Sequence, residues 1–267
     1  MKRKLGINID CLRGLRSNME TLELAHKIGF EAFFVGTCSV EETAALKARG
    51  DEYGMDFEFI HSPFAGINEM WMPGMGYLTM FNSLKESVDI AAACGVPAII
   101  THVSSGWNPP QVNDLGLSRY DELVLYAKEK GVIIALENLR MVGNLAVLID
   151  RYEKMDNVMY CYDAGHENCY TNPVSWLDIF QSRVLCTHIH DNPGRPLDDK
   201  THDFDTHYLP FDGTVDYEQM IRKMDKYGYS GSLMLELNRN MRPDYKEMSD
   251  EEFLRTAYDR IKKISEI

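Results

Sequence analysis

Four short apolar runs in this chain each end in acidic or histidine side chains, and this feature limits the possible folds more than any other. The runs are VIIALEN (Glu137), VMYCYDAGH (Asp163, His166), VLCTHIHDN (His188, His190, Asp191) and GSLMLELN (Glu236). Buried β-strands consist mainly of Val, Ile, Leu and Met, so acidic or histidine side chains at the exits of several strands need a common cause. One site built from many strand ends provides that cause.

The alternation of strand and helix continues along all 267 residues. The expected strands are KLGIN, AFFVG, FEFIHS, AIITHVS, VIIALEN, VMYCYD, VLCTHIH and GSLMLEL. Helical periodicity follows each of them, at residues 19–28, 40–53, 78–94, 117–130, 144–155, 173–180, 217–227 and 250–264. Glycines that favour a left-handed C-cap follow five of these helices, at Gly29, Gly54, Gly95, Gly131 and Gly228.

Eight strand-helix units predict an α/β fold, a (β/α)8 TIM barrel whose single domain spans residues 1–267. A doubly wound sheet is the alternative, but it gives no reason for polar side chains at the ends of strands three to eight. Catalytic groups of TIM barrels lie at the C-terminal ends of the strands, where these side chains fall.

Side-chain parity along the strands supports a closed barrel, because successive residues point to opposite faces. If Glu137 faces the barrel axis, then Val132, Ile134 and Leu136 face the helices. The same count places further residues outward beside His102, His188 and Glu236, namely Ile99, Thr101, Val103, Leu185, Thr187, Ile189, Leu233 and Leu235. Cys161 and Cys186 share the inward parity one layer deeper and are expected to fill the core.

Composition and charge exclude several classes of protein. Hydrophobic residues make up 45% of the chain, as in a globular protein. The net charge of −13 weighs against a broad nucleic-acid surface, although a local basic patch remains open. The N-terminal MKRKLGINID has no signal-peptide run, and no segment approaches the roughly 18 apolar residues of a membrane span, so a cytoplasmic protein without a membrane partner is expected. The six cysteines lack C-x-x-C spacing and are expected to be reduced.

The polar residues at the strand ends predict a metal site. His61, His102, Glu137, Asp163, His188 and Glu236 end strands three to eight, and His166, Asp205 and His207 lie in the loops beyond them. Carboxylates and imidazoles that converge on one mouth either bind metal or repel one another, and metal binding is the less costly explanation. Taken singly, His61 could be a hydrogen-bonded neighbour and Asp163 a turn cap; His190 and His202 remain open, and His26 is expected on a helix surface.

Aromatic and basic side chains near the predicted mouth allow more than one interpretation. The loop INEMWMPGMGY places Met70, Trp71, Met72 and Met75 there, and Trp107 follows in SSGWNPP. Trp71 and Trp107 are candidates for an apolar lid that excludes water, and a subunit interface in a homo-oligomer is the alternative. No glycine-rich phosphate loop is present, and Arg195, Lys200 and Arg239 are expected to be solvated.

Seven motifs resemble, in order and spacing, those of the xylose isomerase-like TIM barrels, the group of sugar-phosphate isomerases and epimerases that also contains endonuclease IV. They are HSPF, THVSSG, ALEN, YDAGH, THIHDN, HYLPFDGTVDY and LELN. The resemblance implies one divalent ion, manganese or zinc with magnesium or cobalt as alternatives, held by Glu137, Asp163, His188 and Glu236. It also implies that Glu137 and Glu236 exchange a proton with a carbon of a small sugar through an enediolate-type intermediate.

The same resemblance leaves an alternative function open. Endonuclease IV uses three zinc ions on this scaffold, and its further ligands find counterparts in His61, His102, His166, Asp205 and His207. These residues are therefore candidates for a second metal or for substrate hydroxyls. The proline-containing HYLPFDGTVDY run is more similar to the isomerases, and the absence of a basic DNA-gripping loop weighs against nucleic acid. A barrel that binds sugar or metal without catalysis is a third possibility.

Overall fold

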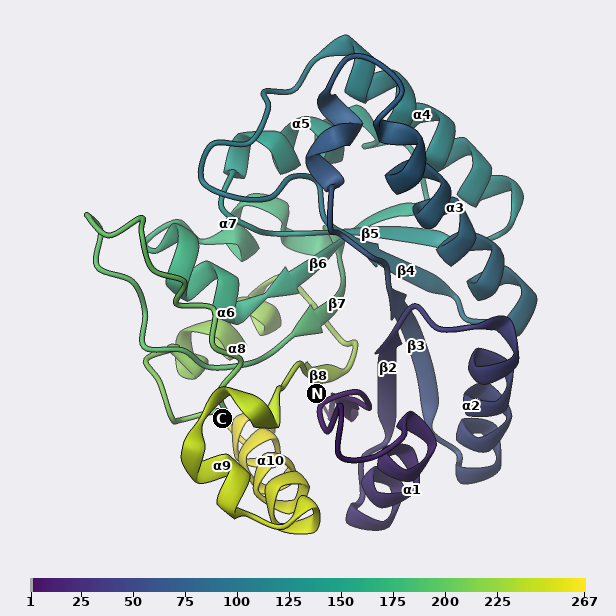
Figure 1. The fold of residues 1–267 in the computed structure, drawn as a ribbon. Coiled ribbons are helices and arrows are strands. Elements are labelled where there is room, and N and C mark those ends of the chain that lie inside the picture. Colours follow the sequence, from purple (N-terminus) through teal and green to yellow (C-terminus); the bar gives the residue numbers. More distant parts are fainter. Residues whose placement is uncertain (1) are drawn as a thin grey trace.

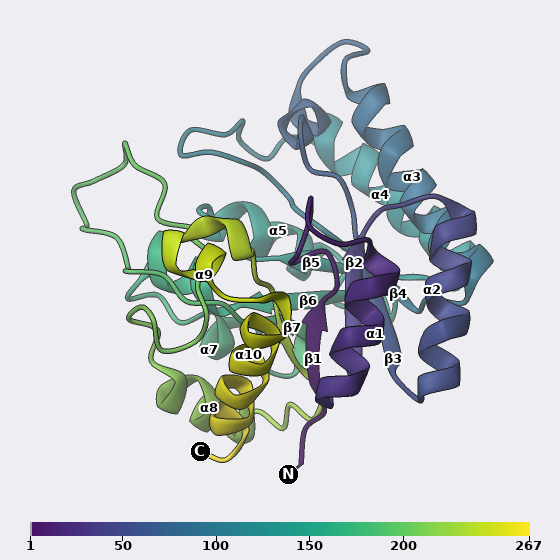
Figure 2. The ribbon, with the colours of Figure 1, turned by 60° about the horizontal axis from the view of Figure 1, so that its bottom comes forward.

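The computed structural model describes residues 2–267 and contains one eight-stranded parallel sheet. The strands are β1 (Leu5–Asn8), β2 (Ala32–Gly36), β3 (Asp56–His61), β4 (Ala98–Thr101), β5 (Ile133–Glu137), β6 (Val158–Asp163), β7 (Val184–His188) and β8 (Leu233–Leu235). Their order is β7-β6-β5-β4-β3-β2-β1-β8, so every strand lies beside its neighbours in the chain. The predicted TIM barrel is confirmed, with the helices arranged outside the strands (Figure 1, Figure 2).

Ten α-helices are present in the described residues: α1 (Asn18–Ile28), α2 (Val40–Tyr53), α3 (Tyr77–Cys94), α4 (Asp114–Glu129), α5 (Val142–Arg151), α6 (Ala164–His166), α7 (Trp176–Phe180), α8 (Tyr217–Lys226), α9 (Pro243–Glu247) and α10 (Asp250–Ser265). The glycines predicted to end helices all have positive φ angles, between 67° and 119°. The short helices α6 and α9 were not predicted, because three to five residues are too few for a periodic pattern. The helix expected from Pro173 begins at Trp176 instead, where Ser175 caps it.

The barrel closes between β7 and β8 through few interactions. Ile189 donates its N–H to the Met234 carbonyl at 2.8 Å, and Glu236 donates to the Ile189 carbonyl at 3.1 Å. The Thr187 hydroxyl lies in the same seam, where it accepts from Met234 N at 3.1 Å and donates to the Ser232 carbonyl at 3.1 Å. The Thr187 hydroxyl thus replaces part of the backbone hydrogen bonding that is missing between β7 and β8.

Two apolar layers surround the strands, as the side-chain parity predicted. The inner layer fills the barrel and consists of Ala32, Phe34, Phe59, Ala98, Ile100, Ala135, Cys161, Cys186 and Met234. Residues predicted to face outward, including Ile134, Leu136 and Leu235, lie in the outer layer beneath the helices. Gly6 makes room for this packing, because a Cβ atom there would lie 2.5 Å from Met234 Sδ. All six cysteines are free, and Cys161 and Cys186 are core fillers as expected.

Leu185 corrects one part of the parity count. It was expected to face the helices, but it packs against the inner layer. The register between β6 and β7 shifts here, since Tyr160 pairs with Val184 whereas Cys161 pairs with Cys186. This irregularity inserts Leu185 as an extra residue and changes the side to which it points.

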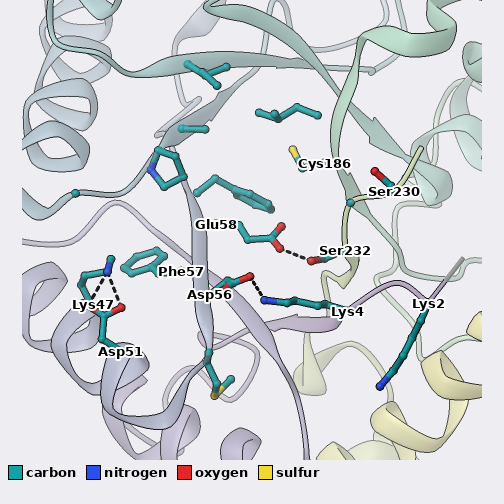
Figure 3. A pocket seen from close by; sticks show the side chains of 18 residues that line it. Lys2, Lys4, Lys47, Asp51, Asp56, Phe57, Glu58, Cys186, Ser230 and Ser232 are labelled. Atoms are coloured by element: carbon teal, nitrogen blue, oxygen red, sulfur yellow. Dashed lines mark hydrogen bonds and ion pairs between the residues drawn. The ribbon is translucent and has the colours of Figure 1, made fainter. Parts of the chain in front are cut away.

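A cavity of about 710 Å³ lies at the N-terminal end of the barrel, opposite the strand ends that carry the polar residues. Figure 3 shows Glu58 pointing into it, with its carboxylate bonded to the Ser232 hydroxyl and the Lys4–Asp56 ion pair beside it. Burial raises the pKa of Glu58 above its usual value. This cavity contains no cluster of metal-ligating side chains among the described residues.

Candidate metal centre

Four strands each bring one potential metal ligand to the C-terminal mouth of the barrel. Glu137, Asp163 and His188 end β5, β6 and β7, and Glu236 follows β8 directly. One ligand atom from each of these four residues lies within 4.8 Å of the others. Glu137, Asp163 and His188 are at most 1% exposed, whereas the Glu236 side chain is 16% exposed. We name this group the strand-end cluster, and its members are the four residues that the sequence predicted as metal ligands.

Glu137 lies at the centre of the polar network. Its Oε2 atom is 3.2 Å from His61 Nε2 and 3.1 Å from His102 Nε2. Its Oε1 atom is 3.2 Å from His166 Nδ1 and 3.3 Å from His188 Nδ1. Burial alone would raise the pKa of Glu137, but the charges of His188 and His102 and their hydrogen bonds outweigh it and hold the pKa well below its usual range.

The two histidines on Glu137 Oε2 have pKa values that shift in opposite directions. Burial lowers the pKa of both, but the hydrogen bond and charge of Glu137 outweigh burial at His61 and raise its pKa to about 9. At His102 burial prevails and the pKa lies below its usual value. The pKa of His61 is thus raised and that of His102 lowered, although both contact the same carboxylate oxygen. Only the neutral form of an imidazole ligates metal.

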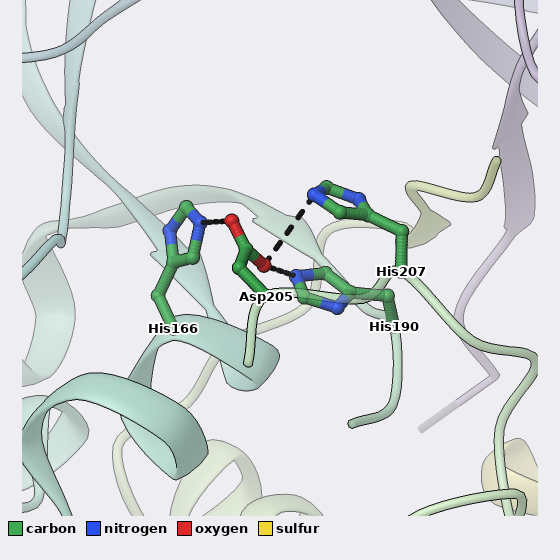
Figure 4. Close-up of side chains that lie close together, drawn as sticks. All are labelled: His166, His190, Asp205 and His207. Carbon is green, nitrogen blue, oxygen red and sulfur yellow. Dashed lines mark hydrogen bonds and ion pairs between the residues drawn. The ribbon is translucent and has the colours of Figure 1, made fainter. Parts of the chain in front are cut away.

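A second group, the loop cluster, consists of His166, His190, Asp205 and His207, whose ligand atoms also lie within 4.8 Å of one another. Figure 4 shows the Asp205 carboxylate between the three imidazoles. Asp205 Oδ2 is 3.0 Å from His166 Nε2, and Asp205 Oδ1 is 3.4 Å from His207 Nε2 and 3.5 Å from His190 Nε2. His190, which the sequence left open, thus belongs to the site.

The loop cluster contacts the strand-end cluster directly. His190 Nε2 lies 3.2 Å from Asp163 Oδ1, and the ring of His190 stacks on that of His207 at 4.0 Å. His207 has a φ angle of 43°, a left-handed conformation that is costly for a residue with a side chain, and its Nδ1 lies 3.0 Å from the Glu236 carbonyl oxygen. Gly165 allows His190 to come close, because a Cβ atom there would lie 2.0 Å from its ring.

Buried polar atoms without partners show that these residues fit a bound cation. Asp163 Oδ2, His188 Nε2 and His190 Nδ1 are buried and make no hydrogen bond to the described residues. His190 Nε2 and Asp205 Oδ1 also lack a well-formed hydrogen bond and make only the ion-pair contacts of 3.2 to 3.5 Å given above. Native proteins satisfy nearly all such atoms, so orphaned acceptors and imidazole nitrogens gathered in one place indicate an ion. Oxygen and imidazole ligands together suit zinc or manganese.

Backbone and amide groups fix the orientation of these ligands. Asn138 follows Glu137, and its Oδ1 accepts from Asp163 N at 2.8 Å while its Nδ2 donates to the Asp163 carbonyl at 2.9 Å. Asp163 also accepts from His166 N at 2.6 Å, so it caps the short helix α6 as well as joining the cluster. Asp191 accepts from Phe211 N at 2.9 Å, which makes it an anchor for the loop after Asp205.

Two cavities open from the clusters. One of about 310 Å³ is lined by His102, Glu137, His166, Glu236 and, beyond the histidines, Arg140. The other, of about 590 Å³, is lined by Asn8, Asp10 and Asn238, and Glu236 lines both. Both are lined by His61, His207 and Phe64, and the Phe64 ring stacks on His102 at 4.5 Å. Phe64 and Arg140 were not predicted as site residues.

The two tryptophans proposed as a lid lie in different places. Trp71 is 1% exposed and packs in the outer layer, where its Nε1 donates to the Val103 carbonyl at 2.8 Å. It does not line either mouth cavity. Trp107 also lines neither cavity, but it packs against Leu139 and Tyr170, which line the smaller one. Met72 and Met75 from the same loop as Trp71 are exposed.

Other candidates from the sequence lie outside the clusters. His202 is exposed and pairs with Asp199, and His26 stacks on Tyr53 at the end of α1. Arg239 was expected to be solvated, but it is 6% exposed and bonded to the Tyr245 carbonyl and the Asp250 carboxylate. None of these residues contributes to the two clusters.

The fold and the ligand arrangement define a TIM barrel with a polar centre at its C-terminal mouth. The chain belongs to the family of xylose isomerase-like TIM barrels, whose sequence profile matches residues 22–262. The resemblance found in the sequence motifs is therefore confirmed. No helix of the described residues is both long and apolar enough to cross a membrane.

Curated relatives are distant. The uncharacterized protein y4fM of Sinorhizobium fredii is 31% identical over 167 residues, which cover 57% of this chain and 51% of that protein, so the match spans about half of its length. Inosose isomerase of Halalkalibacterium halodurans is 24% identical over 195 residues, which cover 69% of this chain and 67% of that enzyme.

Solved structures show the same fold at low identity. D-psicose 3-epimerase from Clostridium cellulolyticum H10, crystallised with D-tagatose, superposes with a TM-score of 0.78 at 15% identity and covers 99% of both chains. The IolI protein with a bound zinc atom superposes with a TM-score of 0.76 at 16% identity and covers 98% of both chains.

Proposed function

We propose that the protein is a divalent-metal-dependent sugar isomerase or epimerase. The observation that carries this proposal is the strand-end cluster, which gathers two glutamates, an aspartate and a histidine around orphaned buried atoms beside an open cavity. Relatives that share the fold are named as enzymes that isomerise inosose or epimerise ketoses, and one of them was solved with zinc. These names support the reaction class for this chain.

Glu137, Asp163, His188 and Glu236 would hold the ion, with manganese or zinc as the best match to their mixed donors. A divalent ion held there would polarise substrate oxygens and make the neighbouring C–H bond more acidic. The remaining chemistry is a proton transfer, which requires a carboxylate within reach of a carbon atom in the cavity.

The two glutamates are suited to different parts of that transfer. Glu236 lines both cavities and is the more exposed of the two, so its carboxylate can reach a substrate carbon. Both oxygens of Glu137 contact two imidazoles each, which fixes the position of its carboxylate. We infer that Glu236 takes the proton from carbon and that Glu137, as a ligand and the second acid-base group, exchanges a proton on the other face.

The test combines metal analysis with isotope exchange. Protein purified without chelator should contain about one equivalent of metal by elemental analysis, and Glu137→Ala should lose it. In deuterium oxide, the metal-loaded protein should incorporate deuterium at a carbon of one member of a ketose panel. Undiminished incorporation by Glu236→Gln would refute the assigned role, and a metal-free wild-type protein would refute the metal site.

The loop cluster favours a second candidate, a multinuclear phosphoesterase of the endonuclease IV kind. The nine residues of the predicted ligand pattern form one network of contacts that includes Glu137 and Asp205. Three groups of potential ligands share residues with one another, and the loop cluster touches them through His166 and His207. Two or three equivalents of zinc and cleavage of abasic duplex DNA would support this candidate. One equivalent of metal, with no cleavage of abasic DNA, would refute this candidate and support the isomerase.

A further inference from the structure

Arg140 lines the smaller mouth cavity together with Glu137 and Glu236. It follows β5 by three residues, and its side chain is only 14% exposed. Its guanidinium lies over the ring of Tyr170 at 3.7 Å and donates from Nη2 to the Tyr170 hydroxyl at 2.6 Å. The contact with Tyr170 holds the positive charge at the wall of the cavity.

This guanidinium is poorly satisfied by the protein. Of its five N–H groups, the described residues accept one hydrogen bond. The Nε atom is buried without an acceptor, and the carboxylate paired with it, Asp203, lies 3.7 Å away. A mostly buried cation with unused donors is costly unless a ligand completes its hydrogen bonds.

Besides Arg140, two further cations lie close to the ring of Trp107. Arg140, Arg195 and Lys200 lie 5.3, 4.5 and 5.9 Å from the centre of a Trp107 ring. Arg195 donates to backbone carbonyls, including those of Cys169 and Asp199, and neither it nor Lys200 forms an ion pair within residues 2–267. Within residues 2–267, Asp203 at 3.7 Å from Arg140 is the one carboxylate within ion-pair distance of these three cations, although Asp205 also lines the cavity. In a chain with a net charge of −13, three cations around one indole are a local concentration of positive charge.

We propose that Arg140, with Arg195 and Lys200 behind it, binds an oxyanion at the end of the substrate remote from the proton-transfer centre. The substrate would then be a phosphorylated or carboxylated sugar rather than a neutral one. A planar guanidinium offers two parallel N–H donors that match the oxygens of phosphate and carboxylate groups. That the rest of the substrate is a sugar rests on the proposed function. The oxyanion site itself depends only on Arg140, Arg195 and Lys200.

The test measures equilibrium binding by titration calorimetry on the full metal-loaded chain. The ligands are D-glucitol, D-glucitol 6-phosphate, L-gulonate, which carries a carboxylate in place of the C6 alcohol, and inorganic phosphate. The variants are Arg140→Met and Arg140→Lys, with Arg222→Met as a control that removes the same charge from an exposed position on α8. The metal ion contributes equally to all four proteins, so differences between them report on Arg140.

We expect wild type and Arg222→Met to bind one of the two anionic polyols roughly 10- to 100-fold more tightly than D-glucitol. Arg140→Met should abolish this preference and weaken phosphate binding, and Arg140→Lys should retain part of it. The tighter anion identifies the source, phosphate ester or carboxylate. An equal preference in wild type and Arg140→Met would show that the arginine only packs on Tyr170 and would overturn the proposal.

The outcomes also separate this proposal from the proposed function. If the polyols bind without a preference that depends on Arg140, the oxyanion site is refuted and the sugar chemistry stands. If no polyol binds but phosphate still binds in a manner that depends on Arg140, the oxyanion site stands and the sugar chemistry is in doubt. Phosphate binding that is equal in all four proteins, without polyol binding, refutes the oxyanion site as well.

Discussion

Glu137 illustrates how one carboxylate can organise a site. Four imidazole nitrogens contact its two oxygens at 3.1 to 3.3 Å. Both oxygens of Glu137 must therefore act as hydrogen-bond acceptors. Glu236 contacts fewer groups, with His188 at 3.4 Å and His207 at 3.7 Å. The two glutamates belong to the same cluster, but replacing them has different physical consequences.

We therefore predict that two isosteric variants change the free energy of unfolding by different amounts. Glu137→Gln turns an amide donor toward two imidazole N–H groups and removes the negative charge from a buried polar network, which should lower the free energy of unfolding by about 3–5 kcal/mol in chelator. Glu236→Gln should change it by less than about 1 kcal/mol, because its carboxylate is partly exposed. Urea unfolding measures both, and equal losses in the two variants would contradict this assignment.

Glu58, at the opposite end of the barrel, supports a prediction about pH. Burial raises its pKa, so the folded protein favours the protonated carboxyl and this contribution to stability is lost as pH rises above the unfolded value of about 4.3. Glu58→Gln mimics the protonated form and should raise the melting temperature at pH 7 by roughly 1–3 °C, with the gain fading toward pH 4. Glu247→Gln removes the same charge from an exposed position and controls for net charge. A gain that grows as pH falls would contradict the argument.

At the scale of elements, the loop after β3 is held by a close approach between a ring and a helix. Trp71, at the end of the short 3-10 helix of residues 67–71, lies against α4 where Gly116 leaves space for it. A Cβ atom at Gly116 would lie 1.9 Å from Trp71 Cε3. Trp71, which the sequence suggested as part of a lid, therefore holds the loop after β3 against α4.

Gly116→Ala should destabilise the protein although alanine is the better helix former. The methyl group would overlap the indole ring, and we expect a loss of about 3 kcal/mol in the free energy of unfolding. Gly143→Ala in α5 is the matched control, because nothing lies within 4 Å of a Cβ atom there, and it should be neutral or stabilising by up to about 0.5 kcal/mol. A neutral Gly116→Ala would mean that Trp71 can move aside easily.

The elements also show what the sequence could and could not predict. Strand ends were predictable because parity is set by the two-residue period of the backbone, which places Glu137 and Cys161 on the same inner side. The inward turn of Leu185 was not, because a register shift depends on the neighbouring strand. Arg140 was missed for a related reason: its unused donors become visible only when Tyr170 and the cavity are placed beside it.

On the scale of the whole molecule, the site ties together parts of the chain that are far apart. The potential ligands come from the ends of β3, β5, β6 and β7, from the residues directly after β4 and β8, and from the loop that carries Asp205 and His207. The seam between β7 and β8 is the weakest part of the barrel ladder, and His188 and Glu236 face each other across it at 3.4 Å. An ion bound by both residues would close the seam where few backbone hydrogen bonds do so.

This arrangement predicts that metal removal weakens the entire fold. A ligand present at 1,000 times its dissociation constant stabilises the folded state by about 4 kcal/mol, so chelation should lower the melting temperature by roughly 10 °C. Glu58→Gln, far from the mouth, should respond as the wild type does, whereas Glu137→Ala should not respond because it has no ion to lose. Calorimetric scans with and without chelator, followed by re-addition of zinc or manganese, measure the effect. A wild-type melting temperature that does not change with chelator would mean that the orphaned atoms of Asp163 and His188 hold no structural ion, and the metal-dependent mechanism would fall with that result.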